Sequence, residues 1–263
     1  KVFSRQSVTP TPSTSLTASW VARQIDARDK GRDGRLEMRM RLIDRHGRAR
    51  ERALTVSYLD AGKAATSARD LDGDRLLVRF TYPNDIKGTA FLVWEHARAE
   101  DERFLYLPAL GRVRRIAGSE RQESFVGSDF TYEDIGGREL DDYTYELLDE
   151  NATWSASDGR TFPAYRLESR ALDKTAPYPR SISLVRKDSF VVVLAEIYNR
   201  RNEREKLFEV RKLEQVQGIW TALDIVMVND LDHTRTELQV TKTEYNIGLS
   251  PSAFSRLELE RGG

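Results

Sequence analysis

The sequence has no cysteine and only three histidines among its 263 residues. The absence of cysteine excludes disulfide bonds, thiolate zinc sites and cysteine nucleophiles together. An excess of charge of either sign is also missing, since 42 Lys and Arg residues balance 42 Asp and Glu residues, and this balance argues against binding to nucleic acid. The longest uninterrupted apolar run, Phe190–Ala195, has six residues. A membrane-crossing helix needs roughly 20, so we expect no membrane-spanning segment.

Catalytic motifs are scarce as well. The sequence contains no nucleophile elbow, phosphate-binding loop, dinucleotide fingerprint or zinc-protease helix. The histidines, at positions 46, 96 and 233, are scattered along the chain, and we expect no metal ion, no cofactor and no catalytic residue. The carboxylates of Asp129 and Glu133 could serve as a general acid and base. A loop that caps a strand or pairs with an arginine is the favoured interpretation.

Residues 1–15 differ in composition from the rest of the chain. They are rich in Ser and Thr and contain Pro10 and Pro12, so we expect a disordered or extended tail. Residues 16–263 are predicted to form a single domain, because a chain that is 39% hydrophobic and 9% aromatic can bury a core. The first residue is Lys1, which is compatible with removal of a signal peptide.

A short amphipathic helix is predicted over residues 16–28. Apolar residues recur there at spacings of three and four, from Leu16 to Ile25, and Thr17 or Ser19 can cap the amino terminus.

Most of the remaining chain alternates between apolar and polar residues with a period of two. In residues 36–42, Leu and Met occupy one parity and charged residues the other, which is typical of a strand with one buried face. Similar segments predict about eleven strands, several of them about ten residues long. An antiparallel sheet of this many strands must curl, and a curled sheet has a concave side.

Three segments are apolar on both parities. They are residues 91–94, 104–107 and 190–197. We expect the first two to be covered on both faces of the sheet. Parity therefore does not tell which of their side chains are concave.

The concave side is predicted to be lined by apolar side chains that either contact a lipid or form an ordinary packed core. Phe125 and Phe130 are included because glycine and serine between them suit a mobile apolar flap, although they suit a core loop nearly as well. The candidate cavity residues are Met38, Met40, Leu42, Leu54, Val56, Tyr58, Leu76, Val78, Phe80, Phe91, Val93, Phe104, Tyr106, Phe125 and Phe130.

Four arginines precede a strongly acidic segment. Arg112, Arg114, Arg115 and Arg121 come before residues 129–150, which hold nine acidic residues and one basic one. Internal ion pairing is the favoured interpretation. The alternative is that one or two of these arginines bind a phosphate or carboxylate head group at the rim of a cavity.

The segments 91–94, 104–116 and 124–134 resemble the family of outer membrane lipoprotein-sorting proteins, relatives of the periplasmic carriers LolA and LolB. The resemblance extends over nearly the whole chain after the tail. It implies a mainly β fold, an unclosed antiparallel β-barrel whose concave side is plugged by helices and loops. It also implies a periplasmic location in a Gram-negative bacterium, association with the outer membrane, binding of acyl chains and an RND-type membrane transporter as a partner. No arginine is matched to a cargo-release residue.

Residue pattern and resemblance together predict a non-enzymatic periplasmic carrier for lipid or lipoprotein acyl chains, acting in transport toward the outer membrane. Burial contributes about 0.8 kcal/mol per methylene, so a chain of about a dozen carbons gains roughly 10 kcal/mol from an apolar cavity. The alternative is a protein-interaction or sensor module on the same half-barrel, without a transported cargo, which reads its partner through the acidic segment or the free sheet edges.

Overall fold

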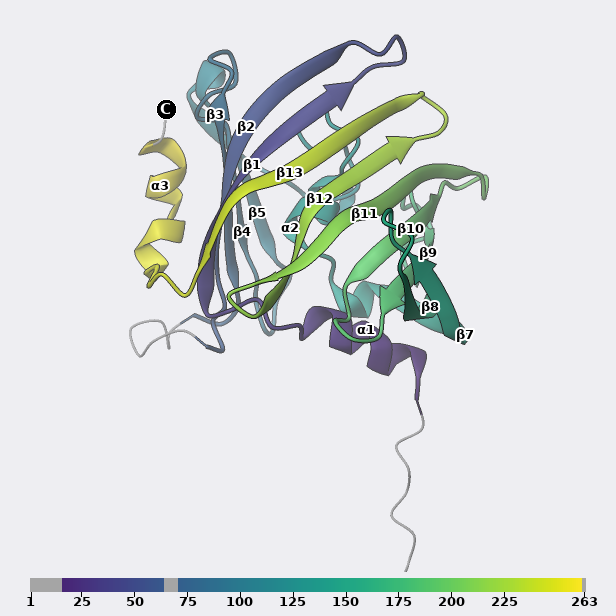
Figure 1. The fold of residues 1–263 in the computed structure, drawn as a ribbon. Helices are drawn as coiled ribbons and strands as arrows, with labels where there is room; N and C mark the ends of the chain where they lie inside the picture. Colours follow the sequence, from purple (N-terminus) through teal and green to yellow (C-terminus); the bar gives the residue numbers. More distant parts are fainter. Residues whose placement is uncertain (1–15, 64–70, 262–263) are drawn as a thin grey trace, which may run out of the picture.

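The computed structural model describes residues 16–63 and 71–261, and every strand in them belongs to one curled antiparallel sheet (Figure 1). The predicted tail, residues 1–15, lies outside the described residues. The strands are β1 (Asp33–Ile43), β2 (Ala49–Leu59), β3 (Arg75–Tyr82), β4 (Ala90–Trp94), β5 (Glu102–Leu107), β6 (Arg112–Arg115), β7 (Tyr143–Ser155), β8 (Thr161–Ala171), β9 (Arg180–Arg186), β10 (Val192–Tyr198), β11 (Arg204–Val216), β12 (Ile219–Asn229) and β13 (Thr234–Tyr245). The helices are α1 (Ala18–Asp26), α2 (Tyr132–Gly136) and α3 (Arg256–Arg261), with short 3-10 turns η2 (Pro108–Leu110), η3 (Gly118–Glu120), η4 (Leu140–Asp142) and η5 (Pro251–Phe254).

The sheet consists of two meanders joined in its middle. Its order is β6-β5-β4-β3-β2-β1-β13-β12-β11-β10-β9-β8-β7, so the first meander runs outward from β1 to β6 and the second runs inward from β7 to β13. The first and last strands of the sequence therefore pair along the centre, where Gly34 lies opposite Tyr245 and Ile43 opposite Arg235. Strands β6 and β7 form the two edges, and the sheet curls without closing.

The predicted fold class is confirmed: the structure is mainly β, antiparallel and open, with a few helices. The strand count of 13 is somewhat higher than predicted. The short edge strand β6 contains three arginines and one valine, so no apolar alternation marks it in the sequence.

Helix α1 confirms the predicted helix within two residues at each end. The Thr17 hydroxyl caps it by accepting a hydrogen bond from the Trp20 amide at 3.1 Å. Its buried residues Val21 and Ala22 pack against Leu167 of β8 and Val185 of β9. Helix α1 therefore covers part of the second meander.

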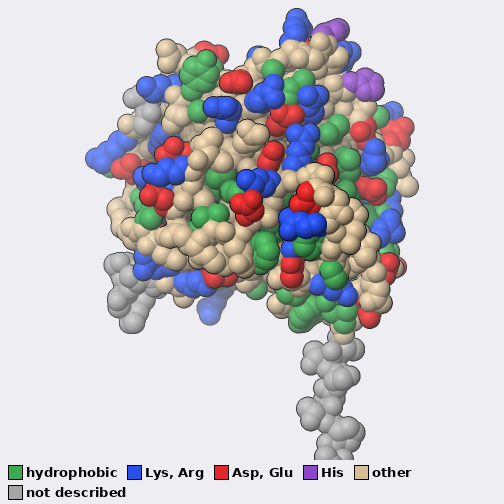
Figure 2. All heavy atoms as spheres, in the orientation of Figure 1, with side chains coloured by type: hydrophobic (Ala, Val, Ile, Leu, Met, Phe, Trp, Pro, Cys, Tyr) green, Lys and Arg blue, Asp and Glu red, His purple; other side chains and the backbone are tan. Residues whose placement is uncertain are grey.

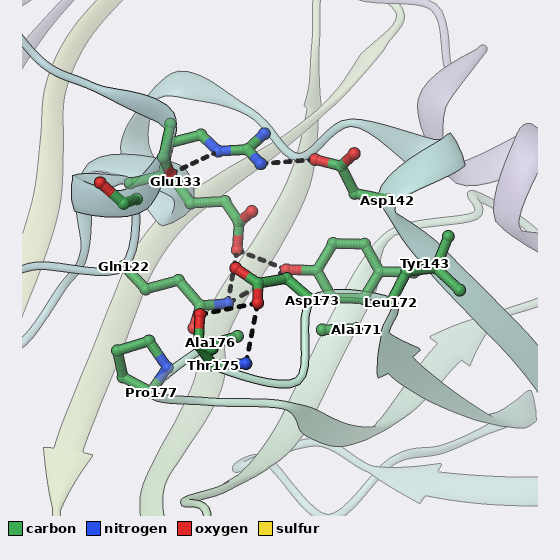
Figure 3. Close-up of a pocket in the computed structure, with 13 residues that line it drawn as sticks. Gln122, Glu133, Asp142, Tyr143, Ala171, Leu172, Asp173, Thr175, Ala176 and Pro177 are labelled. Atoms are coloured by element: carbon green, nitrogen blue, oxygen red, sulfur yellow. Dashed lines mark hydrogen bonds and ion pairs between the residues drawn. The ribbon is translucent and has the colours of Figure 1, made fainter.

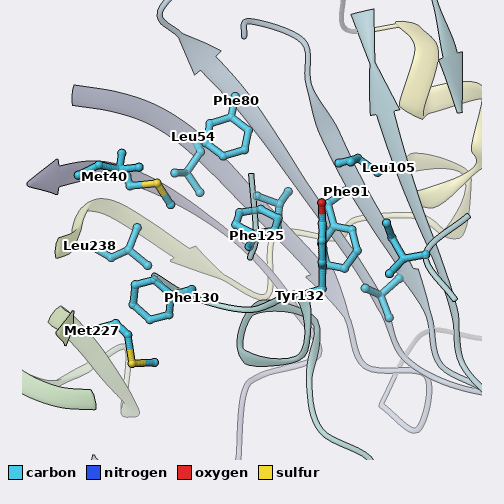
Figure 4. Packing of buried hydrophobic residues seen from close by; sticks show 14 of the residues in the cluster. Met40, Leu54, Phe80, Phe91, Leu105, Phe125, Phe130, Tyr132, Met227 and Leu238 are labelled. Carbon is cyan, nitrogen blue, oxygen red and sulfur yellow. The ribbon is translucent and has the colours of Figure 1, made fainter. Parts of the chain in front are cut away.

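The chain crosses from edge β6 to edge β7 through residues 116–142, which we term the plug. The plug contains α2 and lies inside the curled sheet (Figure 1). Its aromatic residue Phe125 is fully buried, and its ring centroid lies 5.8 Å from that of Phe80 and 5.6 Å from that of Phe91. Figure 4 shows Phe125 and the neighbouring plug residue Phe130 packed between the two meanders.

The convex face of the first meander is covered by the carboxy-terminal segment. Phe254 of η5 and Leu259 of α3 are fully buried against Leu92 of β4 and Phe104 of β5. The indole of Trp94 also donates a hydrogen bond of 2.8 Å to the carbonyl of Phe254. This second layer confirms that the segments 91–94 and 104–107 are buried on both faces.

We expect Leu259→Ala to lower the free energy of unfolding by about 2–5 kcal/mol, because it leaves a cavity under α3. Leu257, on the same helix, is 58% exposed, and Leu257→Ala should change that free energy by less than about 0.5 kcal/mol. Urea unfolding followed by tryptophan fluorescence measures both. Equal effects of the two variants would contradict the role of α3 as a cover.

We expect Phe125→Ala to lower the free energy of unfolding by about 3–5 kcal/mol, because the ring fills the space between plug and sheet. Glu123→Ala, an exposed position in the same segment, is the matched control and should be nearly neutral. The same urea titration applies. A neutral Phe125→Ala would mean that the plug does not pack against β3 and β4.

Candidate functional site

An apolar hollow lies under α1, on the concave face of the second meander. This first cavity has a volume of about 440 Å³. Its walls come from the strands β8 to β12, from α1 and from the plug. The apolar residues among them are Ala22, Ile25, Phe130, Ile135, Leu140, Leu167, Val192, Ala195, Ile197, Phe208, Ile225 and Met227. An apolar hollow of this size is within the range of small-molecule sites.

A second cavity of about 360 Å³ adjoins the first. Phe208 and Ile225 line both cavities, as do Ile25 and Arg28 from the end of α1 and the loop after it. The second cavity extends toward the centre of the sheet, where Tyr58 of β2 and Tyr245 of β13 contribute to its wall. The two cavities thus form neighbouring parts of one apolar region under α1.

The loop between α1 and β1, at the mouth of this region, is firmly anchored. The Tyr58 hydroxyl donates a hydrogen bond to the carbonyl of Lys30, and burial raises the pKa of that hydroxyl above its usual range. The fully buried Asp33 accepts hydrogen bonds from the amides of Ile247 and Gly248 at 2.9 and 3.0 Å. These contacts tie the loop to both β2 and the end of β13.

A small polar pocket of about 100 Å³ lies behind the plug, where the plug meets β7 (Figure 3). The buried carboxylate of Glu133 accepts hydrogen bonds from the Tyr143 hydroxyl at 2.7 Å and from the Gln122 amide at 3.2 Å. Burial raises the pKa of Tyr143 above its usual range, so the hydroxyl stays a donor. Each of these polar groups is already bonded to another, so the arrangement fixes the plug.

The four candidate head-group arginines lie away from both cavities. Arg114 pairs with Glu120 at 2.7 Å, and Arg121 pairs with Glu139 at 3.0 Å. Arg115 lies 3.8 Å from a carboxylate of β5 and is mostly exposed, and Arg112 is exposed on β6. Arg121 therefore pairs with the acidic segment, as the favoured interpretation expects, whereas the partner of Arg114 precedes that segment. None of the four arginines lines either apolar cavity.

The acidic residues near position 129 have structural partners. Asp129 accepts hydrogen bonds from the hydroxyls of Thr234 and Thr236 at 2.5 and 2.7 Å. Asp134 accepts from the amide of Thr131 at 2.7 Å, while the Thr131 hydroxyl caps α2. Together with the bonds of Glu133, these contacts match a capping loop better than an acid and base pair.

Most of the candidate cavity residues lie on the concave face but are covered by the plug. Met40, Leu42, Leu54, Val78, Phe80, Phe91, Val93, Phe125 and Phe130 belong to one buried cluster, with Met38, Val56 and Leu76 packed against it. Among the candidate cavity residues, Phe130 lines the first cavity and Tyr58 lines the second. Leu42 also borders a hollow of about 530 Å³ near the hairpin ends, where Asp44, Arg48 and Arg50 make the wall strongly charged.

Two candidate cavity residues were placed on the wrong face. Phe104 and Tyr106 belong to the convex cluster under η5 and α3, whereas Leu105, between them, faces the plug. Strand β5 is apolar on both parities. Its convex face is shielded from water by η5 and α3, some 150 positions later in the chain. The alternation within β5 could not reveal this.

The cavity walls supplied by β10, β11 and β12 were not among the candidates. Ala195, Phe208 and Ile225 are the main examples. A signal was present in the sequence, since the amphipathic helix 16–28 needs an apolar surface to cover, but nothing in its sequence says which strands supply that surface.

The face of the molecule shown in Figure 2 carries basic and acidic side chains interspersed, with hydrophobic ones between them. In the described part of the chain, no helix has the length and hydropathy required to cross a bilayer. Among these same residues, no group of three or more His, Asp or Glu side chains is arranged to hold a metal ion.

Comparison with known proteins agrees with this architecture. A domain from Vibrio parahaemolyticus, named as an outer membrane lipoprotein-sorting protein, is 28% identical with a TM-score of 0.79, and the match covers 93% of this chain and 98% of that one. A DUF1329 family protein from Desulfovibrio piger is 27% identical with a TM-score of 0.78, covering 92% and 97%. A LolA superfamily protein from Nitrosomonas europaea, 18% identical with a TM-score of 0.65 over 93% and 100%, shares the fold.

No curated protein matches the sequence. A family model described as "-like: Uncharacterized protein" matches residues 72–261, which is more than half of the chain. The predicted resemblance to lipoprotein-sorting and LolA-like proteins is confirmed by the solved structures. The chain therefore belongs to the family whose model matches residues 72–261, and it shares the fold of the protein from Nitrosomonas europaea.

Proposed function

We propose that this protein is a non-enzymatic carrier that binds the acyl chain of a lipid or lipoprotein in the two cavities under α1. The observation that carries the proposal is an apolar region, about 440 Å³ in one part and about 360 Å³ in the other, which the side chains of the protein do not fill. Its floor combines aliphatic and aromatic side chains with Ser169, Ser181 and Ser183, and the strands that form it are fixed by the sheet.

Acyl chains fit the chemistry of this region. Phe208, Ile225 and Val192 line both parts and offer no hydrogen bond from their side chains. A ligand without directional polar groups gains about 0.8 kcal/mol for each methylene that it buries. The free energy gained is similar to that of inserting the chain into a bilayer. Transfer of the chain between membrane and carrier therefore has a small net free-energy change in either direction.

The plug restricts the ligand to the second meander. On the first meander, the rings of Phe125 and Tyr132 pack at an angle against Phe91 and occupy the concave face. Most of the predicted cavity residues therefore serve as core in this proposal, and Tyr58 and Phe130 contact the ligand at its borders.

The cellular setting is part of the same proposal. The similar domain of Vibrio parahaemolyticus is named for lipoprotein sorting at the outer membrane, which supports a periplasmic carrier that acts in transport toward that membrane. An RND-type transporter is proposed as the membrane partner, on the basis of the family resemblance alone.

Blocking the first cavity provides a test. Ala195 is buried in its wall, so Ala195→Trp should fill the hollow and lower the affinity for dodecanoate about tenfold or more. Ala49→Trp, the same substitution at an exposed position of β2, should leave the affinity unchanged. Isothermal titration calorimetry gives the affinities, and thermal unfolding shows whether each variant is folded.

Native mass spectrometry of protein purified from cell envelopes, followed by organic extraction, tests whether acyl lipids are bound in the cell. Co-purified lipid that is lost in Ala195→Trp supports the carrier. Protein that never carries lipid, and binds no dodecanoate, would overturn it and favour the alternative of an interaction or sensor module without cargo.

A further inference from the structure

Arg28 is one of two cations, with Lys30, that line both cavities. It follows α1 by two residues and lines both the first and the second cavity. Its Nε atom is buried and has no hydrogen-bond partner among residues 16–63 and 71–261. Burial lowers the pKa of Arg28, and the only charge interaction that opposes this effect comes from Tyr245, which is not a carboxylate partner.

Arginines of the described chain that are more deeply buried than the partly exposed Arg28 have acidic partners. Arg103, 1% exposed, lies 3.2 Å from Asp101, and Arg186 pairs with Asp188. Such pairing is the rule, because a guanidinium keeps its charge in proteins and loses solvation when it is buried. Arg28 departs from this rule at the wall of an apolar cavity.

The acidic residue next to Arg28 is engaged elsewhere. Asp29 binds the ammonium group of Lys63 at 2.7 Å and the amide of Gly31 at 2.9 Å. Two further cations line the first cavity: Lys30 lies 3.7 Å from Asp74, and Arg138 lies 3.8 Å from Glu133. Arg28 therefore has an unused donor at Nε, whereas Asp29, Lys30 and Arg138 are already paired.

The backbone around Arg28 is also fixed in place. Gly31 adopts a φ of +76°, which suits glycine, and an added Cβ there would lie only 3.1 Å from Asn246. The Asn246 side chain accepts a hydrogen bond of 2.7 Å from the Arg32 amide. A loop held at both β2 and β13 presents the guanidinium at one position relative to the cavities.

We propose that Arg28 binds the anionic head group of the acyl ligand, a carboxylate or a phosphate, while the chain occupies the cavities on either side. The inference rests on the proposed function and narrows it to acyl ligands that carry a negative charge. A guanidinium forms paired hydrogen bonds to either oxyanion, and these bonds are stronger than neutral ones. Binding would supply the partner that the buried Nε atom lacks.

Three probes with the same chain length distinguish the contribution of the head-group charge to affinity from that of the acyl chain. They are dodecanoate, dodecyl phosphate and 1-dodecanol, each titrated calorimetrically at pH 8. We expect the wild-type protein to prefer at least one anion to the alcohol by about tenfold or more. Arg28→Gln should weaken anion binding by roughly 10- to 100-fold and leave binding of 1-dodecanol unchanged. The anion that is preferred identifies the head group as a carboxylate or a phosphate.

Two further variants guard against a merely structural effect. Arg23→Gln, at an exposed position of α1, should behave as the wild-type protein, and Arg28→Lys should recover part of the anion preference. Equal loss of all three probes in Arg28→Gln, or no anion preference in the wild-type protein, would overturn the role of Arg28 while leaving the carrier intact. If none of the three probes binds the wild-type protein, the carrier itself fails.

Discussion

The path of the chain across its own open sheet is the constraint on which the rest of this structure depends. The first meander ends at edge β6 and the second begins at the opposite edge β7, so the connecting residues 116–142 must cross one face. They cross the concave face, and they bring Phe125, Phe130 and Tyr132 with them. One half of the hollow is thereby filled with core, and the other half is left to α1.

Because only one meander is filled by the plug, the protein can contain an internal cavity and remain stable. An unfilled apolar cavity costs stability, because its walls lose packing partners. The cost falls on the second meander, whereas the first is packed on both faces, by the plug inside and by η5 and α3 outside. The central pairing of β1 with β13 transmits this rigidity to the cavity side of the sheet, since both strands belong to one ladder.

The charged groups are arranged around the same division. Polar contacts fix the plug to both edge strands, with Glu120 bound to Arg114 of β6 and Glu133 bound to Tyr143 of β7. Opposite them, at the end of α1, Arg28 borders the unfilled cavities with an unsatisfied Nε atom. Paired charges thus stabilise the plug on one side of the hollow. On the other side, the unpaired Nε atom of Arg28 is the group proposed to recognise a ligand.

The sequence by itself determined the class of fold and much of its local structure. The period of two in residues 36–42 predicted which residues of β1 share an apolar face, and Thr17, one of the two caps that the sequence offered, begins α1. Both features depend on neighbours along the chain. The resemblance also predicted the open half-barrel correctly. Only the tertiary structure decided which part of the concave face is empty and that Phe104 and Tyr106 are convex. Those facts depend on where the plug and the carboxy-terminal helix come to lie, and contacts between segments far apart in the sequence leave no mark on local periodicity.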